Sequence, residues 1–271
     1  DNKLMDTTVI IVSYKSDHLI EKNIEIFDKK TKIIVIDNSQ NKNLKRNIEK
    51  NHENVSVILN LNKGFGQAAN LGAKLSNTKY IFFCSPDNYV EKNAIHELKK
   101  ICKDLKDVFG ILILSEEKEN ISKIVEIQKP SGALCFFIQR KVFLEMSGFD
   151  ENFFLYYEDH DLLKRLLKKK SLIFKIPIKY TNLMGSHDKI YNYEVEINRN
   201  WHYMWSMFYY KKKHYGYFYA FFTTLPILIR SSIRVMINFK KSEKRDIYLA
   251  RFKGLCNSYK LKKSWYRPRI D

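Results

Sequence analysis

The first hundred residues alternate short apolar runs with segments of helical or polar pattern. Four of these runs are rich in β-branched or aromatic residues, as expected for buried parallel strands: Thr8–Ser13, Lys32–Asp37, Val55–Leu59 and Tyr80–Cys84. The segments that follow them are Asp17–Phe27, Asn41–Lys50, Phe65–Ser76 and Glu91–Leu105. Strands that alternate with helices predict an α/β fold with a doubly wound, mostly parallel sheet of Rossmann type.

The second half of the chain breaks this alternation. Strands are predicted at Gly132–Gln139, Leu172–Ile176 and Lys179–Leu183, with a helix at Asp159–Lys170. Three helices are then predicted in an aromatic and basic region: Asn198–Lys213, Tyr215–Phe239 and Glu243–Lys260. The pattern predicts an α/β domain at residues 5–195 and a helical, basic, amphipathic appendage at residues 196–271. A length of 271 residues with 45% hydrophobic residues suits one large domain with an appendage.

The positive charge is concentrated near the C-terminal end. The chain carries a net charge of +18, and residues 201–271 hold 16 Lys and Arg against 3 Asp and Glu. Such a segment favours binding to nucleic acid or to an anionic membrane surface. Because no recognised nucleic-acid reader motif is present, we expect the membrane surface and no nucleic acid.

The apolar part of this segment indicates how it would meet a membrane. Residues 215–229 are almost wholly apolar, and Pro226 and Arg230 are expected to stop the run at about 15 residues, short of the roughly 20 that span a bilayer. A helix lying in the membrane interface is therefore predicted. The alternative is a packed helical hairpin with a solvated basic face.

Cysteines and the N-terminal residues indicate the compartment. The four cysteines, Cys84, Cys102, Cys135 and Cys256, form no C-x-x-C pair, so zinc-ribbon and thioredoxin chemistry are not expected. Buried free thiols fit them better. Residues 1–20 lack the pattern of a secretory signal. A reducing, cytoplasmic setting is predicted.

Polar residues follow the predicted strands at their carboxyl ends, where doubly wound sheets bind ligands. They are Ser13 and Tyr14, Asp37 and Asn38, the segment Asn60 to Gly66, and the segment Ser85 to Asn88. A carboxylate at Asp37 could accept a hydrogen bond from a nucleobase or ribose, and an Asx turn explains it equally well. Pro86 stiffens the turn and would hold Asp87 at this edge of the sheet, where its carboxylate suits Mg²⁺ or Mn²⁺. Pro-Asp-Asn is also an ordinary turn.

The glycines of Gly64-Phe65-Gly66 do not form a dinucleotide fingerprint. They follow the third strand rather than the first, and Ala69 stands where the third glycine would be. A tight turn that caps the helix near Phe65 is one interpretation. The other is a backbone that approaches a ligand at the helix N-terminus.

Three carboxylates, Glu158, Asp159 and Asp161, follow the aromatic run Phe153–Tyr157. Acids in a first helical turn complement the helix dipole, and Asp161 with Arg165 forms an ordinary i,i+4 pair. The aromatic neighbours favour a catalytic role, since desolvation raises the pKa of a carboxyl group toward general-base use. His187 follows a predicted strand and is either structural or a metal ligand beside Asp87.

Together these segments resemble the family 2 glycosyltransferases of GT-A fold, in particular the rhamnosyltransferase-like members. The similarity covers about residues 8–215 and is carried by segments in the family's order: Val9–Tyr14, Ile34–Ser39, Asn62–Gly72, Tyr80–Asp87, Ser131–Phe143, Gly148–Glu151, Phe153–Arg165, His187 and Arg199-Asn200 with Lys211–Lys213.

The resemblance implies transfer of a sugar, with inversion, from a nucleotide diphosphate donor to a hydroxyl. It implies that Asp37 meets the base, that Asn62, Gly64 and Asn70 line the donor pocket, and that Ser13, Tyr14, Asn38 and Pro86 lie close to the donor. It also implies Asp159 as the catalytic base, with Glu158 or Asp161 orienting the acceptor or the backbone.

The same resemblance implies a divalent metal, Mg²⁺ or Mn²⁺. Asp87 stands where the family's Asp-x-Asp motif ends, and His187 would be the second metal contact. Here that motif reads Ser85-Pro86-Asp87, so its first acid is absent.

Expected partners are a nucleotide-sugar donor and a glycan or lipid-linked acceptor for a bacterial surface polysaccharide. A dTDP-rhamnose donor is the first expectation and a UDP-hexose the second, with the chain peripheral on the inner face of the cytoplasmic membrane. The competing hypotheses are a nucleotidyltransferase on the same sheet and a non-enzymatic basic module that binds nucleic acid.

Overall fold

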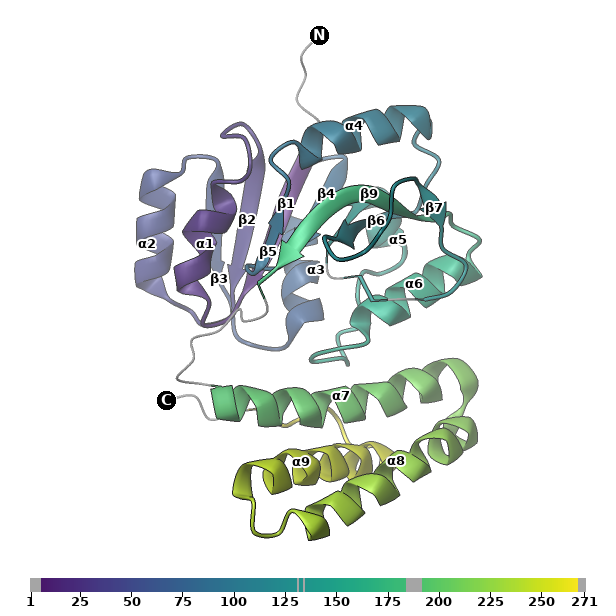
Figure 1. The fold of residues 1–271 in the computed structure, drawn as a ribbon. Helices are drawn as coiled ribbons and strands as arrows, with labels where there is room; N and C mark the ends of the chain where they lie inside the picture. Colours follow the sequence, from purple (N-terminus) through teal and green to yellow (C-terminus); the bar gives the residue numbers. More distant parts are fainter. Residues whose placement is uncertain (1–5, 131, 134, 184–191, 268–271) are drawn as a thin grey trace. The chain divides into compact units, whose positions relative to one another are not determined.

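The chain folds as two compact units (Figure 1), seen in a computed structural model that describes residues 6–130, 132–133, 135–183 and 192–267. We call them the sheet unit, Asp1–Asp150 with Asp159–His187, and the helical unit, Glu151–Glu158 with Asp188–Asp271. The segment Glu151–Glu158 therefore belongs with the C-terminal helices, although it precedes the last helix and strand of the sheet unit. The predicted boundary at residue 195 stays a prediction.

In the described residues of the sheet unit, nine strands form one sheet. They are β1 (Thr7–Ser13), β2 (Lys32–Asp37), β3 (Val55–Leu59), β4 (Tyr80–Cys84), β5 (Asn88–Val90), β6 (Ile111–Glu116), β7 (Val125–Glu126), β8 (Phe136–Gln139) and β9 (Ile173–Asn182). The order is β3-β2-β1-β4-β8-β6-β9-β5, with β7 paired to β9. The first four strands are mutually parallel, whereas β8 is antiparallel to β4 and β6. The mostly parallel α/β sheet was predicted and is confirmed.

Helices cover both faces of this sheet (Figure 1). Those on one face are α1 (Asp17–Ile24), α2 (Lys42–Asn51) and α4 (Ala94–Asp104), and those on the other are α3 (Phe65–Leu75), α5 (Arg140–Glu145) and α6 (Glu158–Lys168). Along β1, Val9 and Ile11 pack into the hydrophobic core under α1, α2 and α4, whereas Ile10 packs into the core under α3, α5 and α6. Because both faces are buried, the strands are apolar throughout instead of alternating with polar residues.

Two strands depart from the sequence-based expectation. No strand was predicted at Ile111–Glu116, which is β6, and the separate strands on either side of Pro177 form the single strand β9. The pairing of β6 with β9 shifts register between Leu114 and Ser115. A strand can hold a proline where its ladder is irregular, because the missing N–H then leaves no regular bond unmade.

The helical unit is built from α7 (Asn192–Tyr215), α8 (Tyr217–Ile237) and α9 (Ser242–Tyr259). Its interior includes the fully buried side chains of Trp201, Phe208 and Leu255. At Gly254 a Cβ atom would lie 2.4 Å from the carbonyl oxygen of Trp201. The absence of a side chain at this glycine therefore lets α9 approach the backbone of α7 closely.

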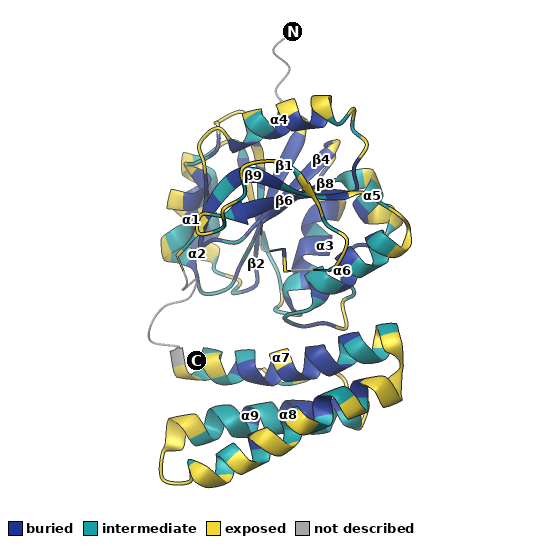
Figure 2. Cartoon of the chain, turned by 45° about the vertical axis from the view of Figure 1, so that its right-hand side comes forward, coloured by how far each residue is buried: buried dark blue, intermediate teal, exposed yellow. Residues whose placement is uncertain are grey.

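The helix predicted at Tyr215–Phe239 is confirmed as α8. It continues through Pro226 and Arg230 to Ile237, so the helix is longer than the apolar run at residues 215–229. Its 21 residues suffice by length and composition to cross a membrane, with a mean hydropathy of 1.4 over an 18-residue window. Much of the apolar surface of α8 is exposed (Figure 2), including Phe218, Phe222, Ile229, Ile233, Met236 and Ile237.

Candidate active site

Asp37 ends β2 with a fully buried side chain. Its Oδ1 accepts a hydrogen bond from the N–H of Ser39 at 2.9 Å, and its Oδ2 accepts one from the N–H of Asn41 at 2.7 Å. The Asx-type turn considered from the sequence is therefore present. Since each carboxylate oxygen can accept more than one hydrogen bond, this turn leaves acceptor capacity for a base or ribose.

Hydrogen bonds join the ends of three neighbouring strands. Ser13 lies opposite Asp37 in the parallel register, and its carbonyl accepts from the N–H of Asn38 at 2.9 Å. The side-chain amide of Asn60, just after β3, donates to Oδ1 of Asn38 at 2.8 Å. Ser13 and Asn38 are buried, and Tyr14 is half-buried beside them. The structure thus brings these predicted donor residues together at one edge of the sheet.

Gly64 begins α3 in a conformation that other residues rarely adopt. Its φ is 109°, and it precedes Phe65 as the N-cap without any side-chain cap. The side-chain oxygen of Asn62 accepts from the N–H of Gly64 at 3.3 Å. The capping turn predicted at this glycine is confirmed, and the uncapped first turn of α3 leaves amide donors suited to an anion.

Asn70, also predicted to line the donor pocket, is bonded to a neighbouring loop. Its Nδ2 donates to the carbonyl of Phe149 at 2.9 Å, and its Oδ1 accepts from the N–H of Phe149 at 2.8 Å. Only 6% of the residue is exposed. This geometry gives Asn70 a structural task, and its contact with a donor stays a prediction.

Asp87 follows β4 and is 9% exposed. The turn before it is fixed by Asn23, whose side-chain amide donates to the carbonyls of Pro86 at 3.3 Å and Asn88 at 2.9 Å. No described residue donates a hydrogen bond to the carboxylate of Asp87, so its oxygens suit a cation. His187 lies outside the described residues. Among the residues that are described, no group of three or more His, Cys, Asp or Glu side chains could hold a metal.

Asp159 lies in the first turn of α6, with 16% of its side chain exposed. Its Oδ2 accepts from the N–H of Ala133 at 2.8 Å. Its Oδ1 accepts from the N–H of His160 at 2.8 Å and contacts Nδ1 of the same histidine at 2.9 Å. With two donors on Oδ1 and one on Oδ2, the described contacts leave an acceptor position on Oδ2.

His160 is a partner of Asp159 that the sequence reasoning missed. Because a carboxylate only accepts, the Nδ1 atom of His160 carries the hydrogen of this bond. Burial lowers the pKa of His160, but the hydrogen bond and the charge of Asp159 outweigh it, so the pKa is raised above its usual 6.5. The available signal was the adjacency of the two residues at a helix start.

The register of the sheet places Asp159 at the same edge as Asp37 and Asp87. The carboxyl ends of β1 to β4 share one edge because these strands are parallel. Strand β8 is antiparallel to β4, with Phe136 opposite Phe83, so the residues before Phe136 lie at that edge. Ala133, which donates to Asp159, is among them. Asp37, Asp87 and Asp159 therefore lie at one edge of the sheet.

The other two predicted acids lie deeper. Asp161 is fully buried, and its Oδ2 accepts from Nε of Arg165 at 2.8 Å. Arg165 in turn donates to the carbonyls of Met146 at 2.5 Å and Gly148 at 2.7 Å. This pair therefore holds the loop before the aromatic run, which favours the orienting role. Glu158, 8% exposed, is the first residue of α6, and its role stays a prediction.

The cysteines are free, as predicted. Cys84, Cys102 and Cys135 are buried and Cys256 is partly buried. Burial raises the pKa of Cys102 to about 12, so this thiol stays protonated at neutral pH.

One curated protein is similar in sequence to part of this chain. The low-salt glycan biosynthesis hexosyltransferase Agl10 of Haloferax volcanii is 24% identical in an alignment 194 residues long that covers 60% of this chain and 62% of the relative. The chain thus matches less than two thirds of that protein's length.

Two solved structures share the fold. A crystal structure of S. aureus TarS residues 1–349 matches with a TM-score of 0.55 and 12% identity, over 98% of this chain and 95% of that one. GalNAc-T7 with UDP, GalNAc and Mn²⁺ also gives a TM-score of 0.55, with 15% identity, over 76% of this chain and 50% of that one. At these identities the matches support the GT-A fold alone.

A family model settles the assignment. The model for glycosyl transferase family 2 matches residues 8–164, which contain β1 to β4, Asp37, Asp87 and Asp159. This match covers more than half of the chain and includes the sheet edge described above. The chain therefore belongs to glycosyl transferase family 2.

Proposed function

We propose that this chain transfers a sugar from a nucleotide diphosphate donor to a hydroxyl, with inversion, using Asp159 as the general base. The observation that carries the proposal is the carboxylate of Asp159, oriented by Ala133 and His160 at the sheet edge that also holds Asp37 and Asp87. Inverting displacement needs one base on the acceptor side and charge stabilisation for the leaving diphosphate.

The reaction requires one proton transfer to the protein. The acceptor hydroxyl gives its proton to Oδ2 of Asp159 while its oxygen bonds to the anomeric carbon. The bond from that carbon to the diphosphate breaks, and the electron pair leaves with the diphosphate. Oδ1 is held by the two donors of His160, so the carboxylate cannot rotate away from the acceptor.

The donor would lie along the ends of β1 to β4. Asp37 would accept from the base or ribose, with Ser13, Tyr14 and Asn38 beside it, and the first turn of α3 after Gly64 would face the diphosphate. Asp87 would hold a divalent cation, with His187 as the second contact. When bound, Mg²⁺ or Mn²⁺ neutralises charge on the leaving diphosphate.

For the donor sugar, rhamnose on dTDP is the first candidate, because Ser85 replaces the first acid of the family's metal motif. A UDP-hexose is the second, supported by the hexosyltransferase relative and by the UDP and Mn²⁺ bound to the structural neighbour. The acceptor is a glycan or a lipid-linked glycan precursor.

Replacement of one atom tests the base. We expect Asp159→Asn to lower kcat by about 10²- to 10⁴-fold, with donor affinity in calorimetry nearly unchanged. Asp104→Asn, the same change on the exposed end of α4, is the control and should leave kcat unchanged. Wild-type turnover by Asp159→Asn would remove Asp159 as the base.

A panel of donors tests the pocket. Thermal shifts with dTDP-rhamnose and UDP-hexoses, with and without Mn²⁺, should show stabilisation by one nucleotide class, since a ligand that binds only the folded state raises stability. Asp87→Ala should remove the metal-dependent part of the shift. No shift with any donor would contradict the transferase proposal.

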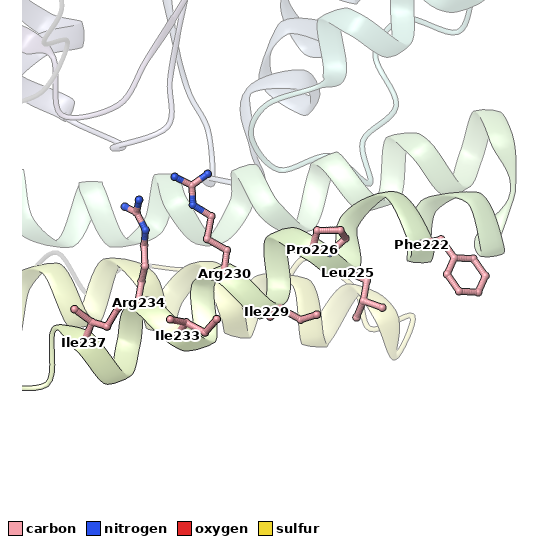
Figure 3. Close-up of a pocket in the computed structure, with 8 residues that line it drawn as sticks. All are labelled: Phe222, Leu225, Pro226, Ile229, Arg230, Ile233, Arg234 and Ile237. Atoms are coloured by element: carbon pink, nitrogen blue, oxygen red, sulfur yellow. The ribbon is translucent and has the colours of Figure 1, made fainter.

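The helical unit supports attachment to the inner face of the cytoplasmic membrane. Phe222, Ile229 and Ile233 are 66%, 52% and 50% exposed and lie at helical spacing along one face of α8. A shallow groove of about 470 Å³ runs along this face, and Figure 3 shows Arg230 and Arg234 extending from the same side of the helix. Apolar residues beside cations suit a helix that lies in an anionic membrane surface.

A further inference from the structure

A strap beyond α9 folds back along α7 within the helical unit. The indole N–H of Trp205 donates to the carbonyl of Lys262 at 3.0 Å, and Nε2 of His202 donates to the carbonyl of Tyr266 at 2.7 Å. The other ring nitrogen of His202 then accepts from the hydroxyl of Ser264 at 2.9 Å. Burial lowers the pKa of His202 to about 3, so the ring stays neutral and the strap stays bonded.

This strap and α7 enclose a hollow of about 340 Å³. The hollow lies within the size range of small-ligand sites. Its walls mix charged, hydroxyl and aromatic side chains, all from the helical unit.

The hollow is positively charged. Lys212, Lys262 and Lys263 line it against one carboxylate, Glu151, which gives a net charge of +2 (three cations and one anion). In the part of the chain that the structure describes, no carboxylate forms an ion pair with any of these three lysines. Three ammonium groups around one cavity favour an anion with several oxygens, such as a phosphate.

The hollow also has an aromatic wall. The rings of Trp205 and Tyr209 stack with centroids 5.0 Å apart and an interplanar angle of 20°. Trp205 is buried, whereas Tyr209 is half-buried and faces the cavity with Lys212, whose Nζ is 5.7 Å from its ring centroid. The electron-rich face of an aromatic ring suits the C–H face of a sugar.

We propose that this hollow binds a phosphate-bearing glycan, with the lysines on the phosphate and Tyr209 against the sugar. The site is separate from the donor edge, which lies in the sheet unit. In naming the ligand as the acceptor, this inference rests on the proposed function. Binding of a sugar phosphate is argued only from the residues that line the hollow.

Chain continuity connects this hollow with the base. Glu151 and Asn152 line it, and the segment that they begin leads to Asp159. That segment is bonded to α7, because the hydroxyl of Ser206 donates to the carbonyl of Leu155 at 2.8 Å and Phe153 packs edge-on against Tyr209 at 4.8 Å. An acceptor held in the hollow would thus be anchored on the segment that precedes the base.

Calorimetry without a donor tests the site. The probes are glucose 1-phosphate, inorganic phosphate and glucose, and we expect glucose 1-phosphate to bind most tightly. The double variant Lys262→Ala/Lys263→Ala should weaken it by about tenfold or more, which corresponds to about 1.4 kcal/mol. Lys240→Ala/Lys241→Ala removes two exposed lysines outside the hollow and should leave the affinity unchanged. Equal losses in the two double variants would overturn the proposal.

Further measurements distinguish a glycan from a lipid headgroup as the source of the phosphate, and this binding site from the proposed catalytic function. Tyr209→Leu should make glucose 1-phosphate bind no better than inorganic phosphate; if the preference for the sugar persists, the aromatic subsite is refuted. If vesicles of phosphatidylglycerol compete with glucose 1-phosphate for the hollow, the ligand is a lipid headgroup and the proposal of a glycan is overturned. Asp159→Asn should bind glucose 1-phosphate as the wild type does, so loss of turnover and loss of this site are distinguishable.

Discussion

The sheet unit is notable for bonded polar side chains in its interior, and the helical unit for large apolar side chains on its surface. In the sheet unit, the fully buried Asp161 and the nearly buried Asn70 are bonded to charged or backbone partners that shape the loops around the site. In the helical unit, large apolar side chains such as Phe222 and Met236 are 66% and 77% exposed. Buried polar groups fix a geometry, whereas exposed apolar groups favour association. This contrast is the basis for proposing catalysis in the sheet unit and membrane attachment in the helical unit.

The largest effect on stability is expected where a buried ion pair is broken. Asp161→Ala leaves the half-buried Arg165 beside the carbonyls of Met146 and Gly148 without its fully buried carboxylate partner. Breaking a buried pair by removing one partner costs about 3–5 kcal/mol. Urea denaturation of the sheet unit should show this loss.

A more accessible pair in the helical unit is the control. The half-buried Asp246 accepts from Nε of Arg245 at 3.0 Å and from the hydroxyl of Tyr193 at 2.6 Å. Surface pairs contribute about 0–1 kcal/mol, so Asp246→Ala should barely change the urea midpoint. Equal losses in the free energy of unfolding for Asp161→Ala and Asp246→Ala would contradict the expectation that the buried pair stabilises the fold more than the accessible pair.

A smaller loss is expected at the contact between α7 and α9. Gly254→Ala places a methyl group 2.4 Å from the carbonyl oxygen of Trp201, which forces the helices apart. Overpacking of this kind costs about 1–3 kcal/mol. We expect calorimetry to show the helical unit melting earlier while the nucleotide-dependent shift of the sheet unit persists. Loss of nucleotide binding in this variant would show that the two units do not fold separately.

The exposed apolar face should matter for binding and not for folding. Phe222→Ser with Ile229→Ser removes two residues that are 66% and 52% exposed, so stability should change little. Affinity for vesicles of phosphatidylglycerol should fall about thirtyfold, because each of the two side chains would contribute about 1 kcal/mol of apolar burial. Thr223→Ser, a change at a half-buried residue of the same helix, is the control. Unchanged vesicle flotation would contradict the interfacial helix.

Alkaline extraction distinguishes lying in the membrane from crossing it. A peripheral helix should be released from vesicles by sodium carbonate at high pH, whereas a spanning helix should remain. The 21 residues of α8 permit both by length, but Arg230, within the helix, and Arg234, in its last turn, favour the interface. Retention after carbonate would turn the assignment toward a membrane span.

Local sequence patterns predicted much of the sheet. β1 to β4 were found because β-branched runs with polar ends mark buried parallel strands, and Asp37 and Asp87 lie at the ends of such strands as expected, while their roles stay predictions. Strand β6 was missed, since a short apolar run such as Ile111–Leu114 has no period that distinguishes strand from helix. β9 was divided at Pro177, because proline disrupts strands unless the ladder is irregular, as it is opposite Leu114.

The contacts that complete the site depend on tertiary pairing. Ala133 meets Asp159 only because β8 runs antiparallel to β4, which no local pattern specifies. The bond between Asn70 and Phe149 joins residues 79 positions apart in the chain. Gly132 is a related case, since a Cβ atom there would lie 3.7 Å from Oδ2 of Asp159. A side chain at residue 132 would therefore be in ordinary van der Waals contact with this oxygen.

The smallest expected effect is a pH dependence at His160. Its pKa is raised in the folded chain, so its ion pair with Asp159 stabilises the fold below the usual pKa of 6.5, and that stabilisation is lost as the pH rises through the folded-state pKa. Since a third of its side chain is exposed, the contribution should be less than about 1 kcal/mol. His160→Asn, whose amide can still donate to Oδ1, should lie below the wild type in urea midpoint at about pH 6 and converge with it by about pH 8.5. A constant difference across this range would mean that the hydrogen bond alone, and not the charge of His160, holds the carboxylate of Asp159.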